Sequence, residues 1–409
     1  MESKQEVPAS PRPPARMLRS LAVMILIVTA LHVYIGLRLL PELPLSGAGV
    51  ATGIVLLLLS AVLMPLGLTA RFVVERQPLS DQLSWAGSLF MGLFSSLFVL
   101  TFLRDVVLLI ASLSATTASV AALRADSAIA VPALALAVTL IGFFNARRVA
   151  RVVHIDIPIA DLAPALAGFI IVQLSDIHMD EYTEPSYLRR VLSHVDSLNP
   201  DAVFLTGDFV SEGPASKGFA VGAAWQCANL LSKLKCRQLY AVLGNHDVAV
   251  GTKDVTAALT ANHIAVLNNA CIPIERFGTK SGGRIWLAGV DDPVNGSPDP
   301  ERAIPASIRN QAGEPVILMC HAPDYADHLL TTQAGKAVGL MLSGHTHGGQ
   351  VRLPLLGPLT LPELGRKYIH GWFRFGDMQL YVNRGIGTVG VPFRLACPPE
   401  ITLITLRRG

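Results

Sequence analysis

Histidine, aspartate and asparagine side chains gather just after short apolar segments in the C-terminal two-thirds of this sequence. Such groups follow the segments at residues 169–175, 202–206, 239–243, 315–320 and 338–343. Five of the eleven histidines belong to this set. Its members are Asp176, His178, Asp208, Asn245, His246, Asp247, His321, His345 and His347. Sites form at the carboxyl ends of strands in open α/β sheets, so we expect these side chains to meet at one edge of one sheet.

The types and spacing of these residues favour a centre for two divalent metal ions. Imidazole nitrogens bind zinc and iron, whereas carboxylate and amide oxygens suit harder ions such as manganese. Residues i and i+2 of an extended segment point the same way. Asp176 with His178, and His345 with His347, can therefore each reach one centre. A carboxylate has two oxygens with which to bridge ions about 3.5–4 Å apart. The pattern does not choose among manganese, iron and zinc.

The ordered motifs DxH, GD, GNHD, H and GHTH resemble those of the calcineurin-like metallophosphoesterase superfamily. The resemblance covers residues 169–350. Apolar runs precede the motifs, and the segments Gly348-Gly349-Gln350-Val351 and Pro398-Pro399-Glu400-Ile401 follow them. This layout is similar to the transmembrane metallophosphoesterase branch, with its phosphodiesterases of the YkuE and YaeI kind. The fold that the resemblance implies is a four-layer αββα sandwich, which follows an N-terminal α-helical transmembrane bundle.

The resemblance also implies a role for each residue of the set. It assigns the first ion to Asp176, His178, Asp208 and His347, and the second ion to Asp208, Asn245, His321 and His345. His246 would face the leaving-group oxygen or the phosphate, and Asp247 would orient its ring. The implied reaction is in-line attack on phosphorus by a hydroxide that bridges the ions, because coordination lowers the pKa of water from about 15.7 to about 7. His246 is the candidate general acid.

Two departures separate this sequence from other branches of the superfamily. Protein Ser/Thr phosphatases carry an arginine soon after the GD motif, but residues 209–213 here contain none. Purple acid phosphatases place a tyrosine ligand three residues after the same aspartate, where this chain has Ser211. Both subfamilies are therefore excluded as close models.

The elements that position these residues are short strands that alternate with helices. Strands are predicted at 152–159, 169–175, 202–206, 239–243, 285–290, 315–320, 338–343, 379–383 and 401–406, and helices at 185–198, 217–234 and 253–262. This alternation predicts a mixed sheet covered on both faces. Glycines precede Asp208, Asn245 and His345, where we expect them to let the backbone turn sharply.

The N-terminal third is predicted to lie in a membrane. Although 51% of the residues are hydrophobic, only 15% are charged. Apolar runs occupy residues 20–41, 49–70, 85–113 and 128–146, and about 20 helical residues suffice to cross a hydrocarbon core of roughly 30 Å. We therefore predict a disordered tail at 1–18, a transmembrane domain at 19–146 and a metallophosphoesterase domain at 152–409.

The placement of basic residues predicts the orientation. Lys4, Arg12, Arg16 and Arg19 precede the first run, and Arg147, Arg148 and Arg151 follow the last. Basic residues near spans are retained on the inner side, so both termini are expected in the cytoplasm. The five cysteines form no CxxC pair, which suits a reducing compartment. The prediction is a multi-pass protein of the cell (inner) membrane whose catalytic domain faces the cytoplasm.

Arg104 and Asp105 lie in the middle of the third apolar run and leave alternatives open. One long helix could carry them as an adjacent ion pair that faces neighbouring helices. A break there would make 106–123 a fifth span and place the C-terminal domain outside. An intramembrane charge pair could also mark a transport pathway.

The predicted function is hydrolysis of phosphodiester or pyrophosphate bonds, possible substrates being lipid-linked or nucleotide-linked compounds near the bilayer. UDP-diacylglucosamine is one candidate, which related family members suggest. The alternative is an inactive domain that serves a membrane transporter or sensor. A tethered nuclease is less favoured, because the net charge is only +3 and no basic groove with interleaved aromatics is evident.

Several polar residues outside the motifs have ordinary interpretations. The histidines His154, His194, His263, His328 and His370 are expected to be surface or packing residues. Asp291 and Asp292 are expected to form a turn. Residues 383–387 have the composition of a phosphate loop but lack the rest of a nucleotide fingerprint, and Arg384 within them is a minor candidate for substrate contact.

Overall fold

A computed structural model describes residues 15–74, 76–180, 182–211, 217–276, 283–309, 311, 313–353 and 355–409. The predicted disordered tail at 1–18 falls mostly outside these residues. The chain divides into two compact units. The helical unit comprises the residues up to Ala70 together with Gln82–Ala137, and the sheet unit comprises Arg71–Asp81 together with Val138–Gly409.

Four long apolar helices form the N-terminal part of the chain. They are α1 (Ala15–Leu39), α2 (Gly47–Val73), α3 (Gln77–Ser114) and α4 (Thr117–Arg147). Each contains a stretch long and apolar enough to cross a membrane. The helix α3 continues through Arg104 and Asp105 without a break. The prediction of four helices is therefore confirmed, and the structure offers no fifth span at 106–123.

Arg104 and Asp105 have partners of opposite charge inside the helical unit. The Asp105 carboxylate accepts hydrogen bonds from the Tyr34 hydroxyl at 2.7 Å and from Arg38 at 2.7 and 2.8 Å. The buried Arg104 guanidinium pairs with Glu42 in the turn after α1. Charged groups in apolar surroundings need such partners. The pair is thus neutralised within the helices, as the single-helix interpretation requires.

Two six-stranded sheets form the centre of the sheet unit. The first has the order β1 (Arg151–Ile159), β14 (Glu400–Arg408), β2 (Ile170–Leu174), β3 (Ala202–Thr206), β4 (Leu239–Val242) and β5 (Ala265–Val266). The second has the order β12 (Gly371–Phe375), β13 (Met378–Val382), β9 (Val338–Ser343), β8 (Val316–Met319), β7 (Ile285–Gly289) and β6 (Ala270–Ile274). A separate hairpin pairs β10 (Arg352–Leu353) with β11 (Gly357–Pro358).

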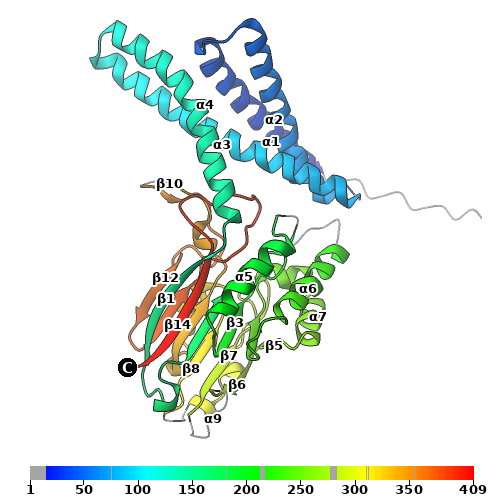
Figure 1. Cartoon of the computed structure of the whole chain (residues 1–409), viewed down its shortest axis with the longest axis vertical. Helices are drawn as coiled ribbons and strands as arrows, with labels where there is room; N and C mark the ends of the chain where they lie inside the picture. Colours follow the sequence, from blue (N-terminus) through cyan, green and yellow to red (C-terminus); the bar gives the residue numbers. More distant parts are fainter. Residues whose placement is uncertain are drawn as a thin grey trace, which may run out of the picture. The chain divides into compact units, whose positions relative to one another are not determined.

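Helices pack on the outer face of each sheet, which gives four layers. The first sheet carries α5 (Pro185–Ser197), α6 (Lys217–Leu231) and α7 (Asn245–Ala261), and the second carries the short α8 (Pro300–Ala303), α9 (Ala306–Arg309) and α10 (Ala326–Leu329). Figure 1 shows α5, α6 and α7 beside the strands of the first sheet. A core that includes Phe204, Ile317 and Leu340 fills the space between the sheets. The predicted αββα sandwich is therefore confirmed.

The local sequence accounts for the main elements of these layers. Leu188, Val191, Leu192 and Val195 of α5 recur at helical spacing, and all four are buried against the first sheet. The strand β3 is buried at every position, because helices cover one face and the second sheet covers the other. The structure differs from the sequence predictions in two respects. The helix predicted at 253–262 begins already at Asn245, and the sequence did not predict β5, β6, β10, β11 and β12.

Candidate metal centre

The loops that carry the predicted ligands leave the carboxyl ends of parallel strands in both sheets. In the first sheet β2, β3 and β4 run parallel and lead into the DxH, GD and GNHD motifs. In the second sheet β8 and β9 run parallel and lead into His321 and the GHTH motif. The expectation that all these residues share one edge of one sheet is therefore wrong. The two sheets face each other, and each contributes part of the site.

The Asp208 carboxylate lies at the centre of the cluster. Its Oδ2 atom lies 3.1 Å from Nε2 of His321 and 3.4 Å from Nε2 of His178. Its Oδ1 atom accepts the backbone N–H of His246 at 3.0 Å. One buried carboxylate therefore contacts a histidine from each of the two predicted ligand groups.

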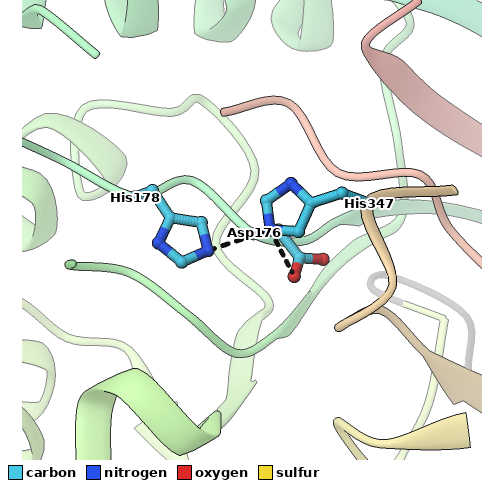
Figure 2. Close-up of side chains that lie close together, drawn as sticks. All are labelled: Asp176, His178 and His347. Carbon is cyan, nitrogen blue, oxygen red and sulfur yellow. Dashed lines mark hydrogen bonds and ion pairs between the residues drawn. The ribbon is translucent and has the colours of Figure 1, made fainter. Parts of the chain in front are cut away.

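Asp176, His178 and His347 form the first ligand group (Figure 2). Figure 2 shows the two imidazole rings beside the Asp176 carboxylate. Nε2 of His347 lies 3.0 Å from Nε2 of His178 and 3.4 Å from Oδ1 of Asp176. The three ligand atoms lie within 4.8 Å of one another. A single cation can reach all three.

Asp208, His321 and His345 form the second ligand group, whose ligand atoms also lie within 4.8 Å of one another. The rings of His321 and His345 meet edge to face, with centroids 4.9 Å apart. Asp208, His178 and His246 satisfy the same distance limit. The carboxylate of Asp208 thus lies beside members of both predicted groups, and His246 lies beside His178.

Contacts outside the cluster fix which nitrogen of each ring points inward. Nδ1 of His178 lies 3.1 Å from the Ser211 hydroxyl, and Nδ1 of His321 lies 2.6 Å from the Thr206 carbonyl. Nε2 of His345 lies 2.6 Å from the Glu363 carbonyl. Such contacts orient metal-binding histidines and set their tautomers. They leave Nε2 of His178, Nε2 of His321 and Nδ1 of His345 for a ligand.

One buried polar atom of the cluster, Oδ1 of Asn245, lacks a hydrogen-bond partner within the described part of the chain. A buried acceptor left unsatisfied is destabilising by about 1–3 kcal/mol. Asn245 belongs to the predicted second group, and a cation bound there would satisfy this oxygen. The donor set of imidazole, carboxylate and amide groups therefore fits divalent metal ions.

The histidines of the cluster differ in pKa because their electrostatic surroundings differ. Burial alone would lower the pKa of His321, but Asp208 and Asp176 outweigh it and raise that pKa to about 10. Burial and the neighbouring His321 lower the pKa of His345 to about 4. Burial and an adjacent histidine hold the pKa of His347 well below its ordinary value. His345 and His347 are neutral at pH 7, which is the state that binds metals.

Neighbouring charges and hydrogen bonds also outweigh burial at Asp208 and keep its carboxyl ionised. Burial would raise the pKa of this carboxyl, but the charges of His321 and His246 and the hydrogen bonds from His178 and His321 hold it well below its usual range. His321 carries a proton in this charge balance, and a bound cation would take the place of that proton.

Five of the predicted ligands adopt left-handed backbone conformations. The φ angles are 51° at Asp176, 48° at His178, 57° at Asp208, 73° at His345 and 50° at His347. Non-glycine residues rarely take positive φ, and such strain clusters at functional sites. The loops therefore hold these side chains in place against the local preference of the backbone.

Glycines allow the loops to approach one another closely. Gly207 has a φ of +93°, and a Cβ there would lie 2.7 Å from Nδ1 of His321. Gly244 has an ordinary φ of −103°, but a Cβ at this position would collide with the Asp208 carboxylate. At Gly244 the requirement is therefore space beside the ligand rather than the sharp turn that the sequence suggested.

Asp247 holds the ligand loops through their backbones. Its fully buried carboxylate accepts the N–H groups of Gly244, Asp208 and Phe209 at 2.8–2.9 Å, with that of Val210 at 3.3 Å. The predicted role of Asp247 in orienting the His246 ring stays a prediction.

Sequence reasoning missed Arg394, which is fully buried beside the first ligand group. Its guanidinium donates to the carbonyls of Gly387, Arg384 and Gly385, and Nη2 lies 3.4 Å from Nδ1 of His347. Burial lowers the pKa of this arginine. It follows no strand end and belongs to no motif, so no sequence signal marked it.

The glycine-rich segment at 383–387 supports Asp176. The N–H of Gly387 donates to the Asp176 carbonyl at 2.8 Å, and a Cβ at Gly385 would lie 2.6 Å from Cβ of Asp176. Arg384 pairs with Glu400, with Nε 3.5 Å from Oε2. The segment thus braces the first ligand loop, and the described contacts give Arg384 a structural partner.

Asp292 forms a turn, as expected of the 291–292 pair. Its buried carboxylate accepts the N–H groups of Val294 and Asn295, and the Asn295 amide donates to the Asn245 carbonyl at 3.0 Å. The turn therefore supports the GNHD loop from outside.

A cavity of about 360 Å³ opens over the cluster. Asp208, Asn245, His246, His345 and His347 line its polar side. Val351, Leu361, Pro362, Val389 and Val391 line an apolar side. The residues that line this cavity do not include His154, His194, His263, His328 or His370. The cluster is thus open to a ligand that has both polar and apolar parts.

Residues 169–349 match the family model described as calcineurin-like phosphoesterase. The chain is 34% identical over 242 residues to the uncharacterized metallophosphoesterase YkuE of Bacillus subtilis, which covers 59% of this chain and 79% of the relative. It is 30% identical to phosphodiesterase YaeI of Escherichia coli, over 59% of this chain and 83% of that protein. The zebrafish (Danio rerio) transmembrane protein with metallophosphoesterase domain is 34% identical over 68% of this chain and 62% of its own length. A dimetal phosphatase structure, also from Danio rerio, aligns with 54% of this chain and 88% of its own, at a TM-score of 0.37 and 12% identity.

Proposed function

Because this chain belongs to the calcineurin-like phosphoesterase family and is a metal-dependent phosphoester hydrolase, we propose that it cleaves phosphodiester or pyrophosphate bonds at a dinuclear centre. The observation that carries the proposal is the position of Asp208, whose Oδ2 atom lies 3.1 Å from His321 and 3.4 Å from His178. A carboxylate between two groups of ligands is an arrangement that can hold two cations a few ångströms apart.

We assign four residues to each ion, with Asp208 shared by both. Asp176, His178, Asp208 and His347 would hold the first ion, and Asp208, Asn245, His321 and His345 the second. The unpartnered Oδ1 of Asn245 and the 3.1 Å approach of Nε2 of His321 to Asp208 support the second assignment. When bound, two divalent ions activate water and offset negative charge on the phosphate. The donor types favour manganese, iron or zinc.

The protein's own groups position the substrate and move protons. His246 is half-buried, its ring lies edge to face with His178 at 4.8 Å between centroids, and it lines the cavity. We assign it proton donation to the leaving-group oxygen. Asp247 keeps the loop of Asp208 in register through the backbone amides that it accepts. The left-handed ligand residues hold the site rigid before substrate arrives.

The proposed preference for diesters rests on the residues after Asp208. A dianionic monoester calls for an additional cation, and Phe209, Val210 and Ser211 supply none. A lipid-linked or nucleotide-linked substrate suits a site on a chain with four candidate spans. UDP-diacylglucosamine is one such compound. We further propose that the protein lies in the cell (inner) membrane with the sheet unit in the cytoplasm, on the basis of the arginines that flank the spans.

Metal analysis of the full-length protein, combined with assays on chromogenic mono- and diesters, tests the proposal. We expect two divalent ions per chain and turnover of bis-p-nitrophenyl phosphate. A protein that binds two ions and hydrolyses neither class of ester would instead support the alternative, a domain that serves a transporter or sensor without catalysis.

A further inference from the structure

Two leucines at the tip of the β10–β11 hairpin are exposed to an unusual degree. Leu355 is 107% exposed and Leu356 is 79% exposed, more than any other large apolar residue described in the sheet unit. Leu359, just after β11, is 55% exposed. Isolated apolar residues on a surface need no explanation, but a cluster of this kind marks an interaction site.

The backbone of the hairpin gives no local reason for a leucine at its tip. Leu355 has a φ of 66°, a left-handed conformation that favours glycine or asparagine. Its full exposure means that it contributes no packing within the chain. Neither turn preference nor the core therefore accounts for this side chain, whereas a partner outside the chain would.

The hairpin is attached to the end of the membrane-spanning helix α4 through the segment 389–395. The Arg352 N–H donates to the Leu395 carbonyl at 3.0 Å, and Val351 forms a β-bridge with Leu395. On the same segment, the Arg394 N–H donates to the Gly142 carbonyl of α4 at 2.9 Å. These contacts all lie within the sheet unit, so the hairpin and the last turns of α4 are held together.

The last turns of α4 also carry exposed apolar side chains. Ile141 is 54% exposed and Phe144 is 64% exposed on the last turns of α4. Figure 1 shows β10 at the end of the sheet unit where α4 meets it. The exposed Arg148 follows directly, and cationic side chains at such a position favour contact with lipid phosphates at a membrane surface. Continuity with a spanning helix identifies the occupant of the hairpin surface as the lipid bilayer.

The same elements build the apolar side of the metal-centre cavity. Val389 and Val391 of the linking segment line it, together with Val351 before β10 and Leu361 just beyond Leu359. The Leu359 N–H donates to the Val351 carbonyl at 3.1 Å, which joins this wall to the hairpin. The cavity therefore has metal ligands on one side and an apolar wall that leads to the exposed leucines on the other.

We propose that the β10–β11 hairpin inserts into the bilayer interface and that the cavity thereby takes phosphodiesters whose acyl chains lie along its apolar wall. The part that concerns the substrate rests on the proposed function, whereas the insertion does not. Burial of two leucines in the interface holds the cavity mouth at the depth of the lipid phosphates. A substrate of this class reaches the ligands without leaving the membrane.

Site-specific labelling tests the insertion directly. The full chain, with the partly exposed Cys236 and Cys271 changed to serine, receives Leu356→Cys and an environment-sensitive fluorophore. It is reconstituted in phosphatidylethanolamine–phosphatidylglycerol vesicles with and without spin-labelled acyl chains. We expect strong quenching at position 356. The matched label, Asp377→Cys, lies in the β12–β13 turn at the opposite edge of its sheet from the ligand loops and stays unquenched. Equal quenching at both positions overturns the insertion.

Competition kinetics test the substrate class with a variant designed to fold. Leu355→Asn with Leu356→Ser removes the apolar tip, and asparagine tolerates the positive φ at 355. With bis-p-nitrophenyl phosphate as reporter, lysophosphatidylglycerol should inhibit the parent protein about tenfold or more better than glycerophosphoglycerol. In the variant this advantage should shrink toward unity while the reporter rate stays within about twofold.

An unchanged advantage in the variant, or none in the parent, overturns the proposed acyl-chain recognition. No reporter hydrolysis in the parent instead refutes the proposed function, and the labelling still decides the insertion.

Discussion

The Oδ2 atom of Asp208 lies 3.1 Å from Nε2 of His321, although the two residues come from different sheets. The same oxygen lies 3.4 Å from Nε2 of His178, so one carboxylate contacts both predicted ligand groups. The charge balance keeps this carboxyl ionised and places a proton on His321, where a cation would bind.

Asp208→Asn should lower turnover of a chromogenic diester by about a hundredfold or more and release metal, because it removes the negative charge shared by both sites. Metal content per chain and kcat are the measurements. Asp377→Asn, an exposed aspartate in the turn between β12 and β13, should change neither. Two bound ions and a near-normal rate in the Asp208 variant would refute the site assignment.

Diesters should turn over faster than monoesters in the presence of Mn²⁺. The reason is that no arginine follows Asp208 among Phe209, Val210 and Ser211 to meet the second negative charge of a monoester. The comparison is kcat/KM for bis-p-nitrophenyl phosphate against p-nitrophenyl phosphate at equal metal loading. A clear preference for the monoester would show that another cation pairs with its second negative charge.

Arg394→Lys should weaken the metal centre although the positive charge remains. A lysine cannot reproduce the hydrogen bonds that the buried guanidinium donates to Gly385 and Gly387 beside His347. We expect about a tenfold loss in metal affinity and roughly 1–3 kcal/mol of stability, measured by metal titration and thermal unfolding in detergent. Arg384→Lys, a partly exposed neighbour, is the matched comparison. Equal, small effects in both variants would deny Arg394 a role in the centre.

Both chain termini should lie in the cytoplasm. Basic residues precede the first span and follow the fourth, and an even number of spans returns the chain to the side on which it began. Alkaline phosphatase fused at Ser119, in the first turn of α4, should be active, whereas a fusion at Gly409 should be inactive. The reverse pattern would place the sheet unit outside the membrane.

The sequence alone determined the number of apolar helices and predicted which residues gather at the candidate site. Asp176 with His178, and His345 with His347, are recognisable because the ligands are close in sequence and follow apolar strands. The run that became α3 was equally readable, since hydropathy is a property of a contiguous segment. The same reasoning accounts for α5, whose buried face repeats at helical spacing.

Only the tertiary structure decided how these pieces meet. Strand spacing predicted one sheet, but β14, from the end of the chain, pairs with both β1 and β2, and a second sheet supplies His321 and the GHTH histidines. Pairing of this kind depends on contacts between distant segments, which no local pattern encodes. Arg394 and Leu355 illustrate the same limit. Arg394 is buried where its segment packs against the loop of His347, and Leu355 is exposed at the tip of the hairpin. The residue types alone predicted neither environment.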